Sequence, residues 1–239
     1  MLNKKSPLPL YAQIEENIKG QIQEGAFKPG DPIPSERELT STYQVSRMTV
    51  RQAVLNLVKN GLLYREKGKG TFVSEEKIEQ PLQGLTSFTE DMRSRGMEPG
   101  NELISFERVI PSFDIADKLG LEIQEEVFFV KRIRYADHKP MAIESTYLPS
   151  KLFPALTEQV VQGSLYDYIA SQMLIIGQAS QSIEAGLAST DEAELLQIEE
   201  PSAVLKIERL SYLTTGTPFE VVHSTYRADR YKFRSEIKR

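Results

Sequence analysis

One stretch of the sequence, Ser46–Val54, combines side chains that bind nucleic acid with side chains that anchor a helix. Ser46 suits the N-cap, and Arg47, Thr49 and Arg51 then project from the first two turns. Arginine and threonine at the exposed start of a helix with an apolar back are typical of a recognition helix in the DNA major groove. The alternative is an ordinary amphipathic helix with a solvated basic face. The apolar back is predicted to consist of Met48, Ala53, Val54, Leu57 and Val58.

A second stretch carries two arginines that alternate along an expected strand. Arg132 and Arg134 share one face of that strand, and Glu144 lies on the neighbouring strand. Two adjacent guanidinium groups are costly unless an anion or a carboxylate lies between them, and arginine is suited to bidentate phosphate contacts. A solvated ladder of ion pairs with Glu144 is one interpretation. The other is a pocket for a phosphorylated sugar, in which Glu144, Glu220 and Tyr226 bind hydroxyl or amide groups.

Two helix starts are candidates to complete such a pocket. In Ser87-Phe88-Thr89, a Ser/Thr cap precedes acidic residues, as expected for a loop that enters a helix. This helix start can cap itself, or it can offer its N–H groups to a phosphate. Ser164 and Tyr166 begin another expected helix, and capping is the favoured role of Ser164.

The composition excludes several kinds of chemistry. The 239 residues include no cysteine, so we expect no disulfide, thiolate metal site or cysteine nucleophile, and two histidines are too few for the usual histidine zinc site. We predict no catalytic residue, no metal and no cofactor. No apolar run approaches the roughly 20 residues that span a membrane, and the N-terminus lacks the apolar core of a signal peptide, so we expect a cytoplasmic protein.

Charge is unevenly distributed along the chain. Residues 1–74 carry 11 Lys and Arg against 7 Asp and Glu, a net charge of +4, whereas the remaining residues carry 18 against 27, a net charge of −9. A basic N-terminal part joined to an acidic C-terminal part fits a head that binds a polyanion and a second domain with a separate role. We therefore predict a DNA-binding domain over 1–74, a charged linker over 75–81 and a second domain over 82–239.

The N-terminal part has the pattern of three helices followed by a hairpin. Gly25 ends the first helix, Ser35 and Glu38 have the spacing of a capping box at the start of the second, and Gly61 follows the third. Gly68-Lys69-Gly70 forms the tip of the hairpin. The helices are expected over Leu10–Ile22, Ser35–Tyr43 and Ser46–Asn60, and the strands over Leu62–Lys67 and Thr71–Val73. This pattern predicts a winged helix-turn-helix in which the hairpin is the wing.

Three motifs of this part resemble the GntR family of bacterial transcription regulators. They are Pro34-Ser35-Glu36-Arg37-Glu38-Leu39, Ser46-Arg47-Met48-Thr49-Val50-Arg51-Gln52-Ala53 and Gly68-Lys69-Gly70-Thr71-Phe72-Val73. The resemblance implies a homodimer that binds a palindromic, double-stranded operator, and the wing glycines let the backbone approach the DNA. The predicted DNA-binding residues are Ser35, Arg37, Ser46, Arg47, Thr49, Arg51, Gly68, Lys69 and Gly70.

The second domain alternates strands and short helices, which indicates an α+β fold with a mainly antiparallel sheet. Strands are expected over 102–110, 126–135, 141–148, 178–185, 204–213 and 219–227, and helices over 115–119, 165–172 and 192–196. Two hairpins look like distant copies, because in each a strand with Lys and Arg precedes a Pro and then a strand with Glu. We interpret this as a weak internal repeat that favours a pseudo-symmetric sheet with a cleft between its halves.

The second domain is similar to the effector domain of the HutC branch of GntR regulators, the UTRA domain, whose fold is similar to that of chorismate lyase. Within this branch, Leu82–Met92, Pro140–Ser145 and Tyr226–Tyr231 resemble repressors of N-acetylglucosamine utilisation. The resemblance implies glucosamine-6-phosphate or N-acetylglucosamine-6-phosphate as the effector. It implies effector contacts at Ser87, Phe88, Thr89, Arg132, Arg134, Glu144, Ser164, Tyr166, Glu220 and Tyr226.

The leading hypothesis is a homodimeric repressor of amino-sugar utilisation whose hold on its operator is reset by a phosphorylated amino sugar. One alternative is a regulator of the same class that responds to another sugar phosphate, a urocanate-like imidazole acid or a phosphonate. The paired arginines disfavour neutral ligands but do not choose among anions. Another alternative is a lyase-like enzyme with Glu144 or Glu220 as acid and base, although the sequence has no recognisable set of nucleophile, base and orienting group.

Overall fold

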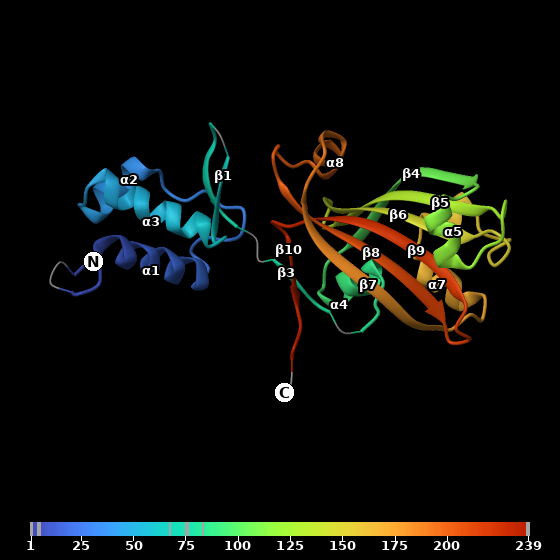
Figure 1. The fold of residues 1–239 in the computed structure, drawn as a ribbon. Coiled ribbons are helices and arrows are strands. Elements are labelled where there is room, and N and C mark those ends of the chain that lie inside the picture. Colours follow the sequence, from blue (N-terminus) through green and yellow to red (C-terminus); the bar gives the residue numbers. More distant parts are fainter. Residues whose placement is uncertain (1, 4–5, 67, 75–76, 83, 238–239) are drawn as a thin grey trace. The chain divides into compact units, whose positions relative to one another are not determined.

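The computed structural model describes residues 2–3, 6–66, 68–74, 77–82 and 84–237. The chain separates into two compact units, with the division between Ile78 and Glu79 (Figure 1). Each unit has its own set of buried apolar residues and therefore its own core.

The N-terminal unit contains three helices and a two-stranded sheet, which confirms the predicted winged helix-turn-helix. Its helices are α1 (Leu10–Gln23), α2 (Glu36–Tyr43) and α3 (Arg47–Lys59), and its strands are β1 (Leu63–Glu66) and β2 (Gly70–Val73). The two strands pair antiparallel, with Leu63 opposite Val73. The buried core consists of Ile14, Ile18, Ile33, Leu39, Val50, Ala53, Val54, Leu57, Leu63 and Val73.

Local sequence signals set the ends of these helices. Ser35 and Glu38 form the predicted capping box, because each side chain accepts a hydrogen bond from the backbone N–H of the other residue. Gly61 follows α3 with a φ of +72°, the left-handed conformation expected after a helix end. The prediction for Met48 was wrong, since this side chain is 70% exposed. Met48 lies two residues, or about 200°, around the helix from the buried Val50.

The C-terminal unit is built on a six-stranded antiparallel sheet in the order β4-β5-β6-β9-β8-β7. Its strands are β4 (Pro99–Val109), β5 (Val127–Ala136), β6 (Lys139–Pro149), β7 (Ile176–Leu187), β8 (Ala203–Leu213) and β9 (Pro218–Arg227). Its helices are α4 (Phe88–Ser94), α5 (Phe113–Leu119), α6 (Glu158–Val161), α7 (Leu165–Ser171) and α8 (Thr190–Leu196). A smaller sheet pairs β3 (Ile78–Pro81) with β10 (Tyr231–Arg234). The predicted α+β class with a mainly antiparallel sheet is confirmed.

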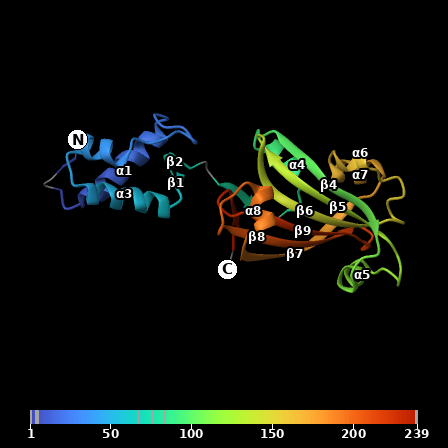
Figure 2. The same cartoon turned by 90° about the horizontal axis from the view of Figure 1, so that it is seen from above.

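Helices cover both faces of the six-stranded sheet. The helices α4, α6 and α7 lie over one face, and α5 and α8 lie over the other (Figures 1 and 2). Side chains alternate accordingly, so that Phe128 and Val130 of β5 pack in the cluster under α6 and α7, whereas Val127 packs with α5. Arg132 and Arg134 continue the alternation of Phe128 and Val130, and this places them on the face under α4 and α7.

The sheet consists of two similar halves, which confirms the predicted internal repeat. In each half the chain forms a helix, a strand, a second helix and a hairpin: α4-β4-α5-β5-β6 first, then α7-β7-α8-β8-β9. The two halves meet along β6 and β9 and run outward in mirrored order, as halves related by a twofold axis do. The starts of α4 and α7 therefore occupy equivalent positions in the two halves.

The connection between the two units is shorter than the predicted linker over 75–81. Residues 75–76 lie outside the described residues, the division between the units falls between Ile78 and Glu79, and Ile78–Pro81 form β3 within the predicted linker. Their strand conformation depends on pairing with β10, a strand that the sequence did not predict. A four-residue segment without apolar alternation gives no periodic signal that would identify it as a strand.

Candidate nucleic-acid interface and ligand pocket

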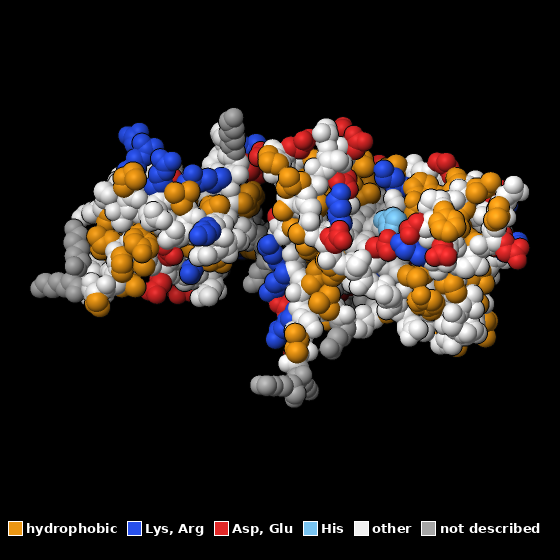
Figure 3. All heavy atoms as spheres, in the orientation of Figure 1, with side chains coloured by type: hydrophobic (Ala, Val, Ile, Leu, Met, Phe, Trp, Pro, Cys, Tyr) orange, Lys and Arg blue, Asp and Glu red, His pale blue; other side chains and the backbone are white. Residues whose placement is uncertain are grey.

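Basic side chains gather on one side of the N-terminal unit. The side chain of Arg47 is 81% exposed, and Arg37 and Arg51 are exposed as well. Figure 3 shows Lys and Arg side chains gathered over the part of this unit that carries α2 and α3. Because side chains at the N-terminal end of a recognition helix reach base edges, Arg47 is placed to read DNA.

Two serines of the predicted DNA-binding set cap the helices that carry these arginines. Ser35 is the N-cap of α2, and Ser46 is the N-cap of α3. The Ser46 hydroxyl accepts a hydrogen bond from the backbone N–H of Thr49 at 3.2 Å and lies 2.8 Å from the Thr49 hydroxyl. These caps fix where each helix begins, and so they position Arg47, the residue after Ser46, and Arg37, two residues after Ser35.

A carboxylate that the sequence analysis did not single out joins three elements of this surface. Glu36, at the start of α2, accepts a hydrogen bond from Arg65 of the wing at 2.7 Å. The Nε atom of Arg47 on α3 lies 3.9 Å from the other oxygen of the same carboxylate. Glu36 therefore holds one basic side chain from each neighbouring element. The sequence could have pointed to Glu36, because this residue lies next to Arg37 in a charged motif.

The tip of the wing has backbone conformations that favour glycine. Gly68 has a φ of +78° and Gly70 a φ of +139°, and side chains rarely adopt either value. Lys69 forms an ion pair with Glu66 at 2.8 Å, and its side chain remains largely exposed. Contact of these three residues with DNA stays a prediction.

In the C-terminal unit, the two predicted arginines lie side by side beneath the start of α4. The same Glu144 oxygen lies 3.3 Å from Nη2 of Arg132 and 3.6 Å from Nε of Arg134. Arg134 also donates a hydrogen bond to the Thr89 hydroxyl at 3.0 Å, and the Phe88 ring covers its guanidinium at 4.8 Å. The arginines and Glu144 are all less than a tenth exposed. The ion pairs exist, but the interpretation of a solvated ladder was wrong because they are buried.

Burial and charge together set the protonation of this group. Burial lowers the pKa of Arg132 to about 10; Glu144 opposes the shift and Arg134 adds to it. Burial alone would raise the pKa of Glu144, but Arg134, Arg132 and Arg209 hold it below its usual value. Burial raises the pKa of Glu220, although Arg209 opposes this, so Glu220 contributes less negative charge. The pocket therefore carries an excess of positive charge and favours an anion.

The structure brings most of the predicted pocket residues together around one small cavity. Nine of the ten line it: Ser87, Phe88, Thr89, Arg132, Arg134, Glu144, Ser164, Tyr166 and Glu220. The tenth, Tyr226, lines an adjoining cavity. Ser87 forms a capping box with Glu90, and the Ser164 hydroxyl accepts a hydrogen bond from the backbone N–H of Asp167 at 3.2 Å. Both serines thus cap their own helices, which was the favoured expectation for Ser164.

Three polar residues of this region were missed. Arg209 and Thr146 line the cavity, and the buried Ser211 donates a hydrogen bond to Glu220 at 2.9 Å. The hydroxyl of Tyr166 donates to the same Glu220 oxygen at 3.2 Å. The internal repeat could have identified Arg209, because this residue occupies the position in β8 that Arg132 occupies in β5.

A winged helix-turn-helix with an exposed basic recognition helix, joined to a second domain with a buried basic pocket, defines a DNA-binding regulator of transcription. Within the described parts of the chain, no helix is long and apolar enough to cross a membrane, and no three His, Cys, Asp or Glu residues cluster as metal ligands. Residues 10–73 match the model of the bacterial regulatory proteins of the gntR family, and residues 94–232 match the UTRA domain. The chain belongs to the GntR family of transcription regulators, in the group whose second domain is a UTRA domain.

Relatives are similar over nearly the whole chain. The chain is 49% identical to the HTH-type transcriptional repressor NagR of Bacillus subtilis (strain 168), over 97% of this chain and 96% of the relative. It is 38% identical to the mannosyl-D-glycerate transport/metabolism system repressor MngR of Escherichia coli (strain K12), over 94% of each. Among solved structures, PhnF from Mycobacterium smegmatis superposes with a TM-score of 0.67 at 30% identity, covering 95% of this chain and 98% of PhnF. Both sequence relatives are repressors, which favours a regulator over an enzyme.

Proposed function

We propose that this protein represses genes of N-acetylglucosamine utilisation and that a phosphorylated amino sugar releases it from its operator. Its 49% identity to NagR supports the regulated process. The family resemblance and the palindromic operator that it implies support a homodimer, in which two heads grip two half-sites. The anionic effector is supported by the chemistry of the pocket.

The observation that carries the effector proposal is a set of unpaired arginine donors. Among the described residues, the Nε atoms of Arg132, Arg134 and Arg209 are buried without a hydrogen-bond partner. Buried polar groups are nearly always paired, so these three donors fit an oxygen-rich ligand, with Arg132 and Arg134 placed for its anionic group. A phosphate suits this arrangement because it accepts several charge-assisted hydrogen bonds from guanidinium groups at once.

Family membership does not choose the anion. MngR, which is 38% identical to this chain, belongs to a mannosyl-D-glycerate system rather than to an amino-sugar system. Another sugar phosphate, an imidazole acid or a phosphonate therefore remains the alternative effector. Glucosamine-6-phosphate and N-acetylglucosamine-6-phosphate are favoured because Glu144 and Glu220 place two carboxyl groups beside the arginines, where they suit the hydroxyl and amide groups of a sugar.

The start of α4 connects the pocket to the rest of the chain. Thr89 occupies one donor of the Arg134 guanidinium while the Phe88 ring covers its face, so a phosphate in the guanidinium plane competes with the Thr89 contact. A ligand shifts a conformational equilibrium only through its different affinity for the two states, and this competition supplies such a difference. We infer that effector binding moves the start of α4 and thereby changes the arrangement in which the two DNA-binding heads contact the operator.

The proposal is tested by titrating the effectors into the protein and into its complex with DNA. Operator fragments are first selected from genomic DNA with the full-length protein at fixed salt. Isothermal calorimetry then covers glucosamine-6-phosphate, N-acetylglucosamine-6-phosphate, other sugar phosphates, urocanate and a phosphonate, and gel shifts follow release of the fragment. We expect an amino-sugar phosphate to weaken operator binding at least tenfold. Unchanged operator affinity over a wide effector range would rule out that effector.

The variant Arg134→Ala distinguishes the effector response of the pocket from the operator binding of the head. We expect this variant to bind the selected fragment as the wild type does and to lose most of its response to the effector. Lys131→Ala is the matched control, because Lys131 lies on the same strand and lines a groove on the opposite face of the sheet. A normal response in Arg134→Ala would remove Arg134 from the effector site.

A further inference from the structure

The cavity at the arginine pair is too small to hold a sugar phosphate by itself. Its volume is about 20 Å³, which is room for roughly one water molecule. A second cavity of about 290 Å³ adjoins it. Small-molecule sites have volumes from roughly 300 Å³ upward, so only the second cavity approaches the size of such a site. If phosphate binds at the arginine pair, as proposed above, the sugar must extend into the second cavity.

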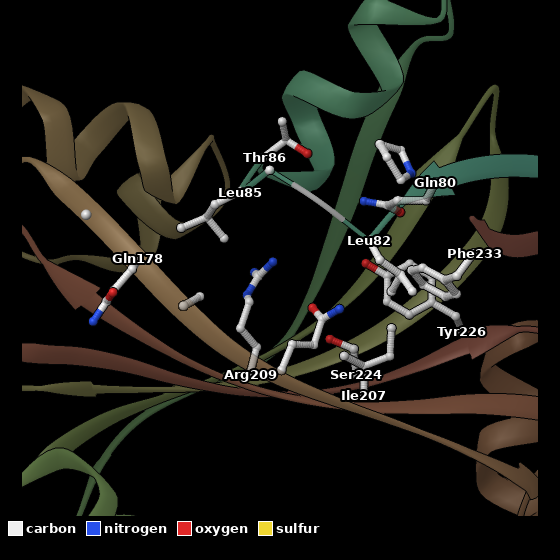
Figure 4. A pocket seen from close by; sticks show the side chains of 15 residues that line it. Gln80, Leu82, Leu85, Thr86, Gln178, Ile207, Arg209, Ser224, Tyr226 and Phe233 are labelled. Carbon is white, nitrogen blue, oxygen red and sulfur yellow. The ribbon is translucent and has the colours of Figure 1, made fainter. Parts of the chain in front are cut away.

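The second cavity lies on the same face of the sheet, over its second half. Strands β8 and β9 form its floor, and β7 forms one side. The lining residues of these strands are Ile207, Arg209, Ser224 and Tyr226, and Gly177, Gln178, Ala179 and Gln181. Leu82, Leu85 and Thr86 line it on the side away from the sheet. Figure 4 shows Arg209 rising from the floor into the middle of the cavity, toward Leu85 and Thr86. Among the described residues, Arg209 alone lines both cavities.

Arg209 interacts electrostatically with Glu144 and Glu220 but forms no close ion pair of the kind that joins Arg132 to Glu144. Its Nε atom is buried without a hydrogen-bond partner, and it forms no ion pair with any described carboxylate. Its nearest aromatic contact is the Tyr166 ring, 5.9 Å away. Glu220 stands close by in the pocket, but one of its oxygens already accepts hydrogen bonds from Tyr166 and Ser211. A guanidinium that faces a cavity in this state has donors to offer to a ligand.

The internal repeat explains why Arg209 differs from its counterpart. In the first hairpin Arg132 lies opposite Glu144, and in the second hairpin Arg209 lies opposite Val222. The two arginines thus share a position in the repeat, but only the first has a carboxylate across the strand. The second hairpin therefore has an arginine at this position, as the first does. The residue opposite it is the apolar Val222 instead of a carboxylate.

We propose that Arg209 binds the acyl oxygen of an acylamino sugar phosphate and so makes the pocket selective for the N-acetylated form. This inference rests on the proposed effector class and adds which member of it is preferred. A carbonyl oxygen accepts charge-assisted hydrogen bonds from the guanidinium, whereas the ammonium group of a free amino sugar is repelled by it. The phosphate remains the charge that Arg132 and Arg134 hold.

Calorimetry with three matched sugars tests the proposal. The probes are N-acetylglucosamine-6-phosphate, glucosamine-6-phosphate and glucose-6-phosphate, titrated into full-length wild type and Arg209→Gln. We expect the wild type to prefer the N-acetylated sugar over the free amine at least tenfold, since hydrogen bonds to charged groups are among the strong ones. Arg209→Gln should reduce this preference to threefold or less and change the affinity for glucose-6-phosphate by no more than about twofold.

Two controls keep the outcome interpretable. Lys206→Gln removes one positive charge from the same strand on the opposite face, where Lys206 pairs with Glu192 at 3.6 Å, and it should retain the wild-type preference. Arg209→Met also removes both the charge and the donors, and it carries the test if thermal melting shows that Arg209→Gln does not fold. A preference that survives both Arg209 variants, or an equal loss for all three sugars, would overturn this inference alone. Absence of sugar-phosphate binding to the wild type would overturn it together with the proposed effector.

Discussion

Glu36 in the head and Glu144 in the pocket each lie beside two arginines, but their surroundings give the contacts different weight. Glu36 is partly exposed and one of its contacts is 3.9 Å long, so its ion pairs contribute roughly 0–1 kcal/mol each. Glu144 is 7% exposed, and removal of one partner from a buried pair costs about 3–5 kcal/mol. Glu36 therefore positions Arg47 and Arg65 and adds little stability, whereas Glu144 is also needed for the fold around the pocket.

Arg47→Ala tests base reading at the start of the recognition helix. If Arg47 contacts a guanine, this change should cost about 1–3 kcal/mol of discrimination between the operator and a version altered at that base. Binding isotherms on the two DNA duplexes, at the same salt concentration, measure this difference. Equal weakening on both duplexes would mean that Arg47 contacts phosphate only.

Lys59→Ala is the matched control for Arg47→Ala. Lys59 is an exposed cation in the last turn of the same helix, at the end opposite to the caps. We expect its removal to leave the discrimination between the two duplexes unchanged, because residues near the C-terminal end of a recognition helix lie farther from the base edges. A similar loss of discrimination in both variants would point to general damage to α3.

At the scale of elements, the glycine after α3 determines where the recognition helix ends. Gly61 has a φ of +72°, and a Cβ atom at this position would have no atom of a non-neighbouring residue within 4 Å. Gly61→Ala therefore strains the backbone but causes no clash. We expect a loss of about 1–2 kcal/mol in the stability of the head. Gly20→Ala in α1 is the matched control, since its site is equally open and helical, and it should stabilise by about 0.5–1 kcal/mol. Thermal melts that move in the same direction would contradict this account.

The pairing of β3 with β10 depends on charge and therefore on pH. Hydrogen bonds from Lys232 and Arg234 lower the pKa of Glu79 to about 2. A lowered pKa stabilises the folded state above the usual carboxyl range, and this contribution disappears as the pH falls from about 4.5 toward 2. We expect Glu79→Gln to lower the melting temperature slightly at pH 7 and to show less change than the wild type across that acid range.

Glu184→Gln is the control for this titration. Glu184 is an exposed carboxylate of β7 in the same unit, so its loss removes an equal charge without touching β3 or β10. Melting curves recorded from pH 7 to pH 2 should follow the wild type. Identical acid profiles for Glu79→Gln and the wild type would show that the β3–β10 ion pairs do not stabilise the protein measurably.

The elements that the sequence predicted well are those whose signals are local. The capping box at Ser35, the glycine at Gly61 and strict alternation around Arg132 each fixed an element without knowledge of the rest of the chain. The missed strand β10 has no such signal, because its conformation depends on a partner far away in the sequence. Arg209 was missed for a related reason: its strand was predicted, but only the sheet order shows that this strand borders the pocket.

At the scale of the whole molecule, the division of charge separates two kinds of binding. The arginines of the predicted DNA-binding surface are exposed to water, whereas the arginines of the pocket are buried. Surface contacts are screened by salt, and a protein that makes about 6–10 phosphate contacts loses roughly 10³–10⁵ in DNA affinity between about 50 and about 200 mM salt. Buried charges are screened much less.

We therefore expect salt to act on the two sites unequally. Over the interval from about 50 to about 200 mM salt, operator affinity should fall steeply, while affinity for the sugar phosphate should change by less than about tenfold. Fluorescence anisotropy with labelled operator and calorimetry with the sugar phosphate measure the two affinities in the same buffers. Parallel salt dependence would place the effector contacts on the surface instead.

The mirrored order of the sheet has a consequence for how such a domain changes over evolutionary time. A duplicated segment supplies two copies of one hairpin, and the copies accumulate substitutions independently. Selection can preserve the proposed phosphate site of the first copy while the second copy, with Arg209 and Val222, changes its contacts to the rest of the proposed ligand. A regulator built this way can acquire a new inducer without first losing the old one.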